Sequence, residues 1–377
     1  MSTATQRYDF VIVGGGIAGA SCAHFLSERG AGSILLLERE SGPGHHATGR
    51  SAAFLNELDF VRPLQQLKAD SGRFLRAPPP GFADGPLVDD VGVLSLFETS
   101  WPHFVDQIAP TLAADGVAHL LLDDPGSAKA RVEVLEPSTF RGAVFLPESG
   151  NLDVYRLLSS YLRHARARGV EVRFDSEITG IQVERGRCVG VVTAEGLIRA
   201  RSVVNAAGAW AGVVARMAGA APIAVQPMRR CAVTFTAPVG VDPRGWPLAA
   251  HIDRSVYFEP EGDGFLMSPM DEAPMEPCDA RPDDVTIAAA MERLATFAPR
   301  IVPQTLRRKW AGLRTFAPDR VFVVGEDPLV PGFFWLAGQG GCGIETSPAV
   351  GQIAADLLTT GATDRFDARV LSPARFA

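Results

Sequence analysis

The first forty residues alternate between apolar runs and a glycine cluster. Tyr8–Val13 is a short β-branched run, which predicts a buried parallel strand. Gly14–Gly19 follows it, and the pattern then predicts a helix over Ala20–Arg29. A second apolar run, Ser33–Leu37, ends at the acid Glu38. Strand, glycine turn, helix, strand and acid within about 30 residues are typical of a unit that binds a dinucleotide.

The glycines of this turn have separate physical roles. Gly14 permits the tight turn, Gly16 lets the backbone approach a pyrophosphate, and Gly19 lets the helix pack against the sheet. The helix N-terminus offers unpaired N–H groups and its positive dipole end to that pyrophosphate. Glu38 is placed to accept hydrogen bonds from a ribose, and an acid here disfavours a 2′-phosphate.

A second strand-to-helix glycine turn lies near the end of the chain. The apolar runs Val321–Gly325 and Phe333–Ala337 predict strands, and Gly338–Ile344 leads from the second of them into a helix predicted over Ser347–Leu358. Such a second turn is unusual for a nicotinamide dehydrogenase. A helix N-terminus there could stabilise negative charge on a reduced flavin, so the pattern favours a flavin cofactor.

The remaining patterns predict two domains, since 377 residues are many for one core. The pattern predicts a helix over Leu152–Arg168, and the strands that follow it up to Val204 look like the β-meander of FAD folds. Two other stretches are richer in proline, charge and broken strands. We therefore expect an α/β protein: a discontinuous Rossmann-type FAD-binding domain (1–85, 148–215 and 316–377) with a second, mixed antiparallel sheet (α+β) forming the substrate domain (86–147 and 216–315).

Composition and charge exclude several classes of protein. The net charge of −7 and the lack of Lys/Arg runs argue against nucleic acid as the main ligand. Five scattered cysteines argue against a disulfide scaffold or zinc site. The adjacent His45 and His46 are expected to be exposed loop residues, so no metal is expected. Phe10–Ala20 is too short to span a membrane, and with the first strand near Tyr8 we expect a cytoplasmic protein.

Four motifs together resemble the FAD-dependent D-amino-acid oxidase superfamily, which includes glycine oxidase and sarcosine oxidase. They are Gly14–Gly19 with Glu38, Thr48–Ala53, Val204–Trp210 and Gly338–Gly343. Within the superfamily three further segments look most like the D-arginine dehydrogenases: Gln226–Arg230, Trp310–Arg314 and Leu371–Pro373. The resemblance covers the whole chain.

This resemblance implies an FAD cofactor. We expect it to be non-covalent, because the segment Trp310–Phe316, where some relatives carry the attachment cysteine, has none. The residues implied to contact FAD are Gly14, Gly16, Ile17, Ala18, Gly19, Glu38, Arg39, Thr48, Gly49, Arg50, Ser51, Ala52, Ala207, Gly208, Trp210, Gly338, Gly340, Gly341, Gly343 and Ile344.

The substrate side is expected to hold a carboxylate. A planar guanidinium fork matches a carboxylate, and by resemblance Arg230 and Arg314 are the candidates for this clamp. The resemblance also implies that Tyr257 lines the pocket and that the Gly341 carbonyl faces the substrate amine.

Five implied pocket positions depart from the D-arginine dehydrogenases. The D-arginine dehydrogenases have a histidine where this chain has Phe54, a threonine at Asn56 and a tyrosine at Asp59. The acid that pairs with an arginine side chain is Val93 here, and a glutamine is Glu345. We expect Asp59 to be solvated and Glu345 to cap the last helix, so the pocket should prefer D-amino acids with neutral, medium-sized side chains.

The favoured function is therefore FAD-dependent oxidative deamination of a D-amino acid to a 2-oxo acid and ammonia, by hydride transfer from the α-carbon to flavin N5. Oxidation of N-alkylated amino acids, as in sarcosine oxidase, is the first alternative. A 2-hydroxy-acid dehydrogenase normally needs a histidine base, which Phe54 disfavours. A non-catalytic flavin-binding assembly protein would not need both arginines. The expected partners are a small amino-acid substrate and, as electron acceptor, oxygen or a quinone.

Overall fold

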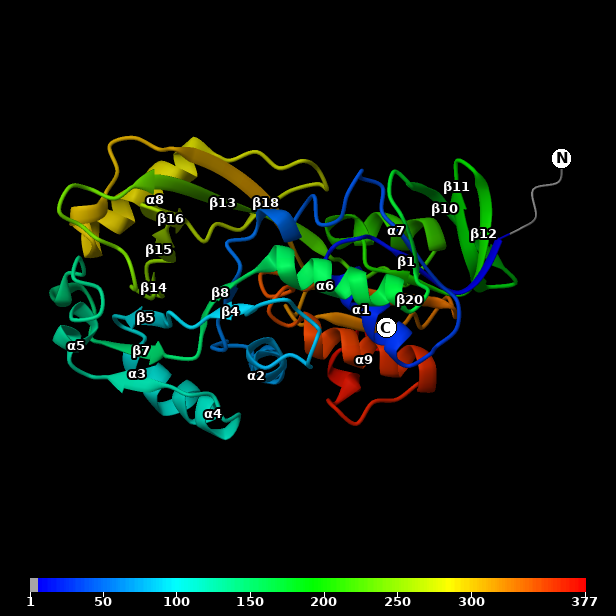
Figure 1. The fold of residues 1–377 in the computed structure, drawn as a ribbon, viewed down its shortest axis with the longest axis horizontal. Coiled ribbons are helices and arrows are strands. Elements are labelled where there is room, and N and C mark those ends of the chain that lie inside the picture. The colour runs from blue at the N-terminus through cyan, green and yellow to red at the C-terminus, as the bar shows by residue number, and fades with distance from the viewer. Residues whose placement is uncertain (1–5) are drawn as a thin grey trace.

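The computed structural model describes residues 6–377 and contains two large β-sheets (Figure 1). In the first, the central strand β1 pairs in parallel with β2 and with β12, and β20 continues the parallel set beside β12. β10 and β11 join β12 in an antiparallel meander. The eight strands of this sheet are β1 Gln6–Val13, β2 Ile34–Leu37, β9 Glu171–Arg173, β10 Ile178–Glu184, β11 Arg187–Thr193, β12 Gly196–Asn205, β19 Val323–Glu326 and β20 Phe333–Ala337.

Alternating side chains of β1 place this sheet between two layers. Phe10 and Ile12 pack into a core with helices α1, α6 and α9, whereas Val11 and Val13 pack into a second core that contains α7. The helices are α1 Ile17–Glu28, α2 Arg62–Arg76, α6 Val154–Ala167, α7 Ala211–Ala218 and α9 Ser347–Thr360. Parallel strands covered by helices on both faces form the Rossmann-type half that the sequence predicts.

The second sheet has nine strands and lies at the other end of the molecule in Figure 1. Its pairing is antiparallel except between β5 and β14, which run parallel. The strands are β5 Val93–Phe97, β6 Leu120–Leu122, β7 Gly142–Leu146, β13 Gln226–Thr236, β14 Leu248–His251, β15 Val256–Glu261, β16 Gly264–Ser268, β17 Ala273–Pro274 and β18 Arg308–Phe316. This mixed sheet beside the Rossmann-type half confirms the predicted fold class.

Helices cover one face of the nine-stranded sheet and part of the other. Phe258 of β15 and Met267 of β16 pack against α8 (Asp284–Phe297), whose N-cap Asp283 accepts hydrogen bonds from the first turn. On the other face, Val93 and Phe97 pack against a helical segment that includes one π-helical turn. The remaining helices are α3 Trp101–His103, η2 Phe104–Ile108, α4 Ala109–Ala114 and α5 Pro125–Lys129.

A small third sheet connects the two halves. β3 (Phe54–Leu55) and β4 (Val88–Asp89) both pair with β8 (Gly150–Leu152). The β3 strand leads through a short loop into α2, so this loop lies where the helical layer of the first sheet meets the second sheet.

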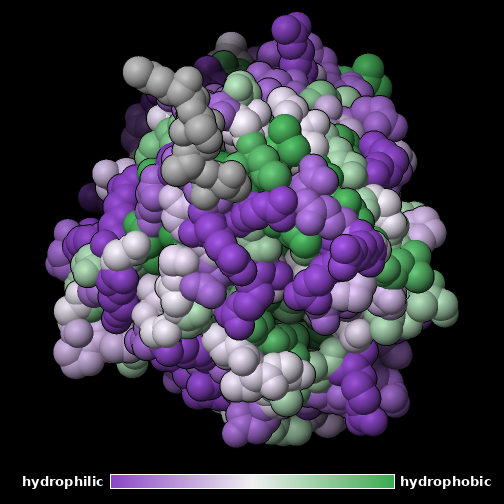
Figure 2. Space-filling view, turned by 90° about the vertical axis from the view of Figure 1, so that its right-hand side faces the viewer, coloured by the Kyte–Doolittle hydropathy of each residue, from purple (hydrophilic) through white to green (hydrophobic). Residues whose placement is uncertain are grey.

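Figure 2 shows the end of the molecule that carries the β10–β12 meander. Hydrophilic side chains cover most of this face, and hydrophobic ones appear only in small groups. Such a surface is typical of an antiparallel meander with one solvated side. Within residues 6–377, no helix combines the length and apolar character needed to cross a bilayer.

Candidate active site

A cavity lined by both large sheets begins at the turn between β1 and α1. Gly14 has φ +112°, and a Cβ added there would lie 2.4 Å from the carbonyl oxygen of Ala206. A Cβ at Gly19 would lie 2.0 Å from the Gly14 oxygen. No side chain fits at either position, so the chain turns here without covering the helix end. Gly16 is the N-cap of α1 and supplies no side-chain cap, so the helix N-terminus faces the cavity wall.

Glu38 is fixed at the carboxyl end of β2. Its Oε2 accepts a hydrogen bond from Gly15 N at 2.7 Å, and its Oε1 accepts one from Glu40 N at 2.9 Å. Thr48 Oγ1 accepts from Ile17 N at 3.1 Å. These contacts hold an acidic and a hydroxyl side chain beside the helix end, an arrangement that fits the ribose and pyrophosphate of a dinucleotide.

Aromatic and charged side chains form the wall beyond Glu38. The guanidinium carbon of Arg39 lies 3.8 Å from the centroid of the Trp210 ring, and the His46 ring lies 4.6 Å from the same ring. His46 Nε2 lies 2.8 Å from Glu40 Oε1 and 2.9 Å from Arg39 Nη2. Burial lowers the pKa of His46 and the Glu40 contact opposes this, with a net decrease that favours the neutral ring.

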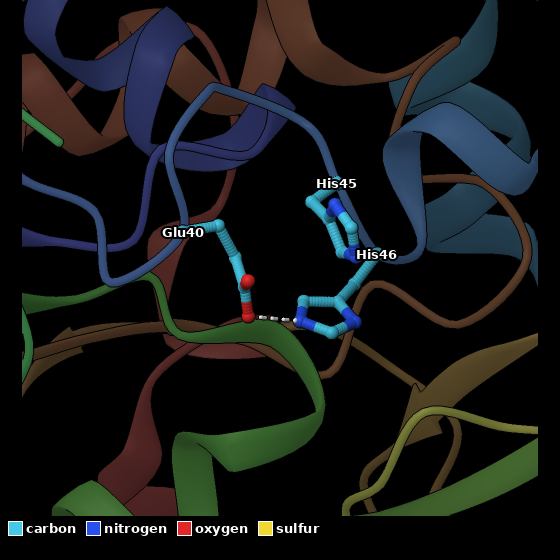
Figure 3. A group of neighbouring side chains, drawn as sticks. All are labelled: Glu40, His45 and His46. Atoms are coloured by element: carbon cyan, nitrogen blue, oxygen red, sulfur yellow. Dashed lines mark hydrogen bonds and ion pairs between the residues drawn. The ribbon is translucent and has the colours of Figure 1, made fainter. Parts of the chain in front are cut away.

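Figure 3 shows that Glu40, His45 and His46 point toward one another. Their ligand atoms lie within 4.8 Å, which is close enough for a metal ion. However, the Arg39 guanidinium contacts the nitrogen of His46 that faces Glu40, and it would repel a cation. The group is therefore better suited to packing against Trp210 than to holding a metal.

The second glycine turn connects β20 to α9 and forms another part of the wall. Gly338 and Gly340 have φ values of +75° and +52°, and a Cβ at Gly340 would lie 2.3 Å from the Phe316 ring. Gly341, Gly343 and Ile344 also line the cavity. The turn thus brings bare backbone to the cavity surface, which fits close approach of a flat ring system.

Most residues implied to contact the cofactor line this cavity. Gly19 and Gly49 do not, and both are needed for packing, since a Cβ at Gly49 would lie 2.6 Å from the Gly44 oxygen. The sequence interpretation missed several lining residues: His45, His46, Ser176, Glu177, Ile178, Cys278 and Gln339. Ser176 and Glu177 follow the parallel strand β9 and could have been found by their place at its carboxyl end.

The four residues expected to bind the substrate line the same cavity. In the β13–β18 ladder, Arg230 lies opposite Gly312, and Arg314 lies two residues further along β18. The two arginines therefore come from one antiparallel ribbon. Tyr257 of β15 and Gly341 of the glycine turn complete the group, and a Cβ at Gly341 would lie 3.4 Å from Arg314 Nε.

The two arginines have different surroundings. Arg230 Nε donates to the Asp271 carbonyl at 2.8 Å, and its Nη2 pairs with Glu272 at 3.1 Å. Burial and the nearby Arg314 lower the pKa of Arg230 to about 10. Arg314 Nη1 is buried and has no hydrogen-bond partner among residues 6–377. A guanidinium beside the glycine turn with such a buried, unpaired N–H group can receive an anion.

Tyr257 is neutral in this setting. Burial raises the pKa of its hydroxyl and Glu259 adds to this, while the two arginines act in the opposite direction without cancelling the rise. A neutral phenol keeps its proton and can donate a hydrogen bond to a bound carboxylate.

None of the five implied pocket positions that depart from the D-arginine dehydrogenases is among the residues that line this cavity. Phe54 packs against the apolar cluster that contains Val93. Asn56 N donates to Glu345 Oε2 at 2.6 Å. Asp59 and Glu345 both pair with Lys68 and are only 15% and 7% exposed, so Asp59 is not solvated and Glu345 does not cap α9. Lys68 itself gave no sequence signal, because a lone lysine on an amphipathic helix is usually solvated.

Together, the Rossmann-type sheet, the bare glycine turns and the two cavity-lining arginines are typical of a flavin-dependent oxidoreductase. The chain belongs to the FAD dependent oxidoreductase (DAO) family, whose model matches residues 9–357. FAD is therefore its cofactor, and the resemblance drawn from the motifs is confirmed at the level of the superfamily.

Individual relatives are distant. The chain is 24% identical to mouse mitochondrial dimethylglycine dehydrogenase over 98% of its own length but only 44% of that protein. It thus spans less than half of the mammalian dimethylglycine dehydrogenases it matches. It is 26% identical to the hydrogen cyanide synthase subunit HcnC of Pseudomonas aeruginosa, over 98% of this chain and 97% of that one.

Solved structures share the fold. L-Proline dehydrogenase from P. horikoshii superposes with a TM-score of 0.88 at 23% identity, covering 99% of this chain and 98% of that one. Glycine oxidase from Geobacillus kaustophilus gives 0.82 at 24% identity, with 98% of each chain covered.

Proposed function

We propose that this protein oxidises a small amino acid at the carbon that bears nitrogen, with oxidative deamination of a D-amino acid to a 2-oxo acid and ammonia as the favoured reaction. One observation carries the proposal: Arg314 lines the cavity beside the glycine turn, and its buried Nη1 has no hydrogen-bond partner among residues 6–377. A buried charged donor without a partner is costly unless a ligand supplies an acceptor.

The chain's own residues orient the substrate. The fork of Arg314 binds the carboxylate, and the Tyr257 hydroxyl donates to it. Arg230, held by Asp271 and Glu272, adds fixed positive charge. The Gly341 carbonyl accepts a hydrogen bond from the amine. Bound FAD supplies the acceptor for the hydride and its two electrons.

The neutral amine is the reactive form. Its lone pair forms the C=N bond as the hydride leaves, so no dedicated base has to abstract a proton from carbon. Water then hydrolyses the imino acid to the 2-oxo acid and ammonia. A 2-hydroxy acid would need a base, and the only histidines in the cavity wall, His45 and His46, lie near Arg39 and Trp210.

Oxidation of an N-alkylated amino acid is the second candidate. Relatives matching most of this chain are described as dimethylglycine dehydrogenase, sarcosine dehydrogenase and 4-methylaminobutanoate oxidase. The same clamp serves both reactions, because only the space around the nitrogen distinguishes them.

The side-chain preference follows from Asp59 and Glu345. Both carboxylates are committed to Lys68, which leaves neither to anchor a substrate cation. We expect D-methionine and D-leucine to be better substrates than D-arginine and D-lysine.

Anaerobic bleaching of the FAD absorption by D-, L- and N-methyl amino acids and by 2-hydroxy acids tests these proposals. Bleaching by D-amino acids supports the favoured reaction, and bleaching by N-methyl amino acids alone supports the second. A response to 2-hydroxy acids alone would refute both. Hydrogen peroxide formation in air, compared with reduction of a quinone, then identifies the electron acceptor.

A further inference from the structure

A buried cluster of three charged side chains lies behind the second glycine turn. Lys68 Nζ of α2 is 3.0 Å from Asp59 Oδ2 and 3.1 Å from Glu345 Oε1, and it donates to the Leu58 carbonyl at 3.1 Å. The Lys68 side chain is 5% exposed. We call Lys68, Asp59 and Glu345 the buried triad.

The charges of the buried triad do not balance. Two carboxylates share one ammonium, so the triad carries one net negative charge when all three groups are ionised. Burial acts against the ammonium of Lys68, but Asp59, Cys342 and Glu345 together outweigh it and hold the pKa of Lys68 well above its ordinary value. Burial raises the pKa of Glu345, which places its ionisation at higher pH than that of an exposed glutamate.

The triad lies next to the proposed substrate site. Cys342 Sγ is 3.8 Å from Asp59 Oδ2, while its neighbours Gly341 and Gly343 line the cavity. The charges of Lys68, Glu345, Asp59 and Arg314 all act on the Cys342 thiol. Gly341, the residue before Cys342, lies beside Arg314, since a Cβ there would lie 3.4 Å from Arg314 Nε. A single residue of the turn therefore separates the triad from the clamp.

We propose that the buried triad is an electrostatic device that stabilises positive charge on the substrate nitrogen. This inference rests on the proposed oxidation of an amine. As the C–H bond breaks, the hydride leaves with both electrons, the nitrogen lone pair forms the C=N bond, and the nitrogen becomes positive. Fixed negative charge in a site away from water favours this change. The three residues do not touch the substrate, so they are positioning residues that act across the turn.

The negative charge of the buried triad also acts on the substrate before the reaction, and there it works against the reaction. It stabilises the ammonium form, so the reactive neutral amine appears at higher pH. The ionisable groups that act on this region are those of the triad, the thiol of Cys342, and the side chains of Arg230, Tyr257 and Arg314, together with the acids Glu259, Asp271 and Glu272 that act on Tyr257 and Arg230. Burial raises the pKa of Cys342 to about 12, so the thiol stays neutral over the working range.

The test uses variants that change the net charge of the triad in opposite directions. Asp59→Asn or Glu345→Gln removes a negative charge, and the midpoint of the alkaline rise in kcat/KM should move down by about half to one pH unit. Lys68→Met leaves two uncompensated acids, and the midpoint should move up by a similar amount. The double variant Lys68→Met/Glu345→Gln keeps the net charge at minus one and should return the midpoint to that of the unmodified protein.

Glu57→Gln is the matched control. Glu57 lies in the same loop and is buried, but it pairs with Arg76 at 2.7 Å and does not take part in the triad. Its loss should weaken folding without moving the midpoint. Shifts in the same direction for the acid and lysine variants, or no shift in either, would overturn the proposal and leave the triad a structural ion pair.

Ligand binding gives a readout that does not depend on turnover. Trimethylammonioacetate and 3,3-dimethylbutanoate have the same shape and differ by one fixed positive charge at the nitrogen position. With holoenzyme, trimethylammonioacetate should bind more tightly than 3,3-dimethylbutanoate. The ratio of dissociation constants, that of 3,3-dimethylbutanoate divided by that of trimethylammonioacetate, should therefore exceed one. Glu345→Gln should reduce that ratio about three- to tenfold, and Lys68→Met should increase it. An unchanged ratio in both variants would contradict the proposal.

The proposed function and the role of the buried triad can be refuted separately. If no amino acid bleaches the FAD of the unmodified protein, the proposed function is wrong. If amino acids bleach it but the charge variants share one midpoint, only the role of the buried triad is wrong.

Discussion

The two ends of the cavity are built in different ways. At the cofactor end, backbone dominates: Gly14, Gly16 and Gly19 bring a helix N-terminus to the wall, and Glu38 is held by two backbone N–H groups. At the substrate end, side chains dominate, and they come from β13, β15 and β18. We therefore expect FAD binding to be lost when an atom is added to one of these glycines. Substrate binding should be lost when a charged side chain is removed.

The largest effect should come from adding one methyl group at the cofactor end. Gly14→Ala puts a Cβ into contact with Ala206 at a backbone φ that other residues rarely adopt. We expect the purified protein to lack FAD and to unfold at lower temperature. Gly42→Ala is the control, since nothing lies within 4 Å of a Cβ there. FAD absorption per protein measures the result, and a fully yellow Gly14→Ala protein would contradict the steric argument.

At the substrate end, Arg314→Ala should leave FAD bound and abolish most of the activity. Loss of a charge partner from a desolvated site costs about 2–5 kcal/mol, so kcat/KM should fall about 30- to 4,000-fold. Arg314→Lys should recover only part, because an ammonium does not reproduce the planar fork. Near-normal kcat/KM in Arg314→Ala would show that the carboxylate binds elsewhere.

Arg230→Ala should have a smaller effect than Arg314→Ala. Two of the donors of Arg230 are committed to Asp271 and Glu272, and Arg320 still pairs with Glu272 at 2.9 Å after the change. We expect kcat/KM to fall about tenfold, as for one charge-assisted hydrogen bond. Steady-state kinetics of both variants decide the order, and a greater loss for Arg230→Ala would reverse the roles assigned to the two arginines.

The smallest effect concerns a contact between the two ends. Arg50 lines the cavity and pairs with Asp279 at 2.5 Å, and Cys278 beside Asp279 also lines it. Asp279→Asn should speed FAD release about two- to fivefold, as expected for an exposed ion pair. Asp284→Asn, which breaks the exposed pair with Lys309, is the control. Flavin fluorescence follows the release, and equal rates in the two variants would exclude a retaining role for this loop.

Local patterns made the cofactor end predictable. The strand, turn, helix and acid up to Glu38 are consecutive, and helix α6 has clear apolar periodicity. The grouping of Arg230, Tyr257 and Arg314 came from the family resemblance, since no spacing indicates that β13 and β18 pair with Arg230 opposite Gly312.

The buried triad could not be predicted. Asp59 and Glu345 are 286 positions apart in the sequence and meet only through Lys68. Helix α2 was not predicted from the sequence, although Leu64, Leu67 and Leu75 are buried at helical spacing; the polar Gln65 and Lys68 are buried in the same helix. A resemblance to a family predicts where a residue lies in the fold but not where its side chain points.

The place of the second glycine turn in the chain also affects biosynthesis. β20 enters the first sheet beside β12, and the turn from Gly338 to Gly343 follows it, more than 300 residues after β1. A chain still growing on the ribosome has its Gly14 turn early but cannot complete the flavin-facing wall until β20 and this turn emerge. Holoenzyme formation must therefore follow the synthesis of β20, and FAD should protect residues 1–377 far better than a nascent chain truncated before β19.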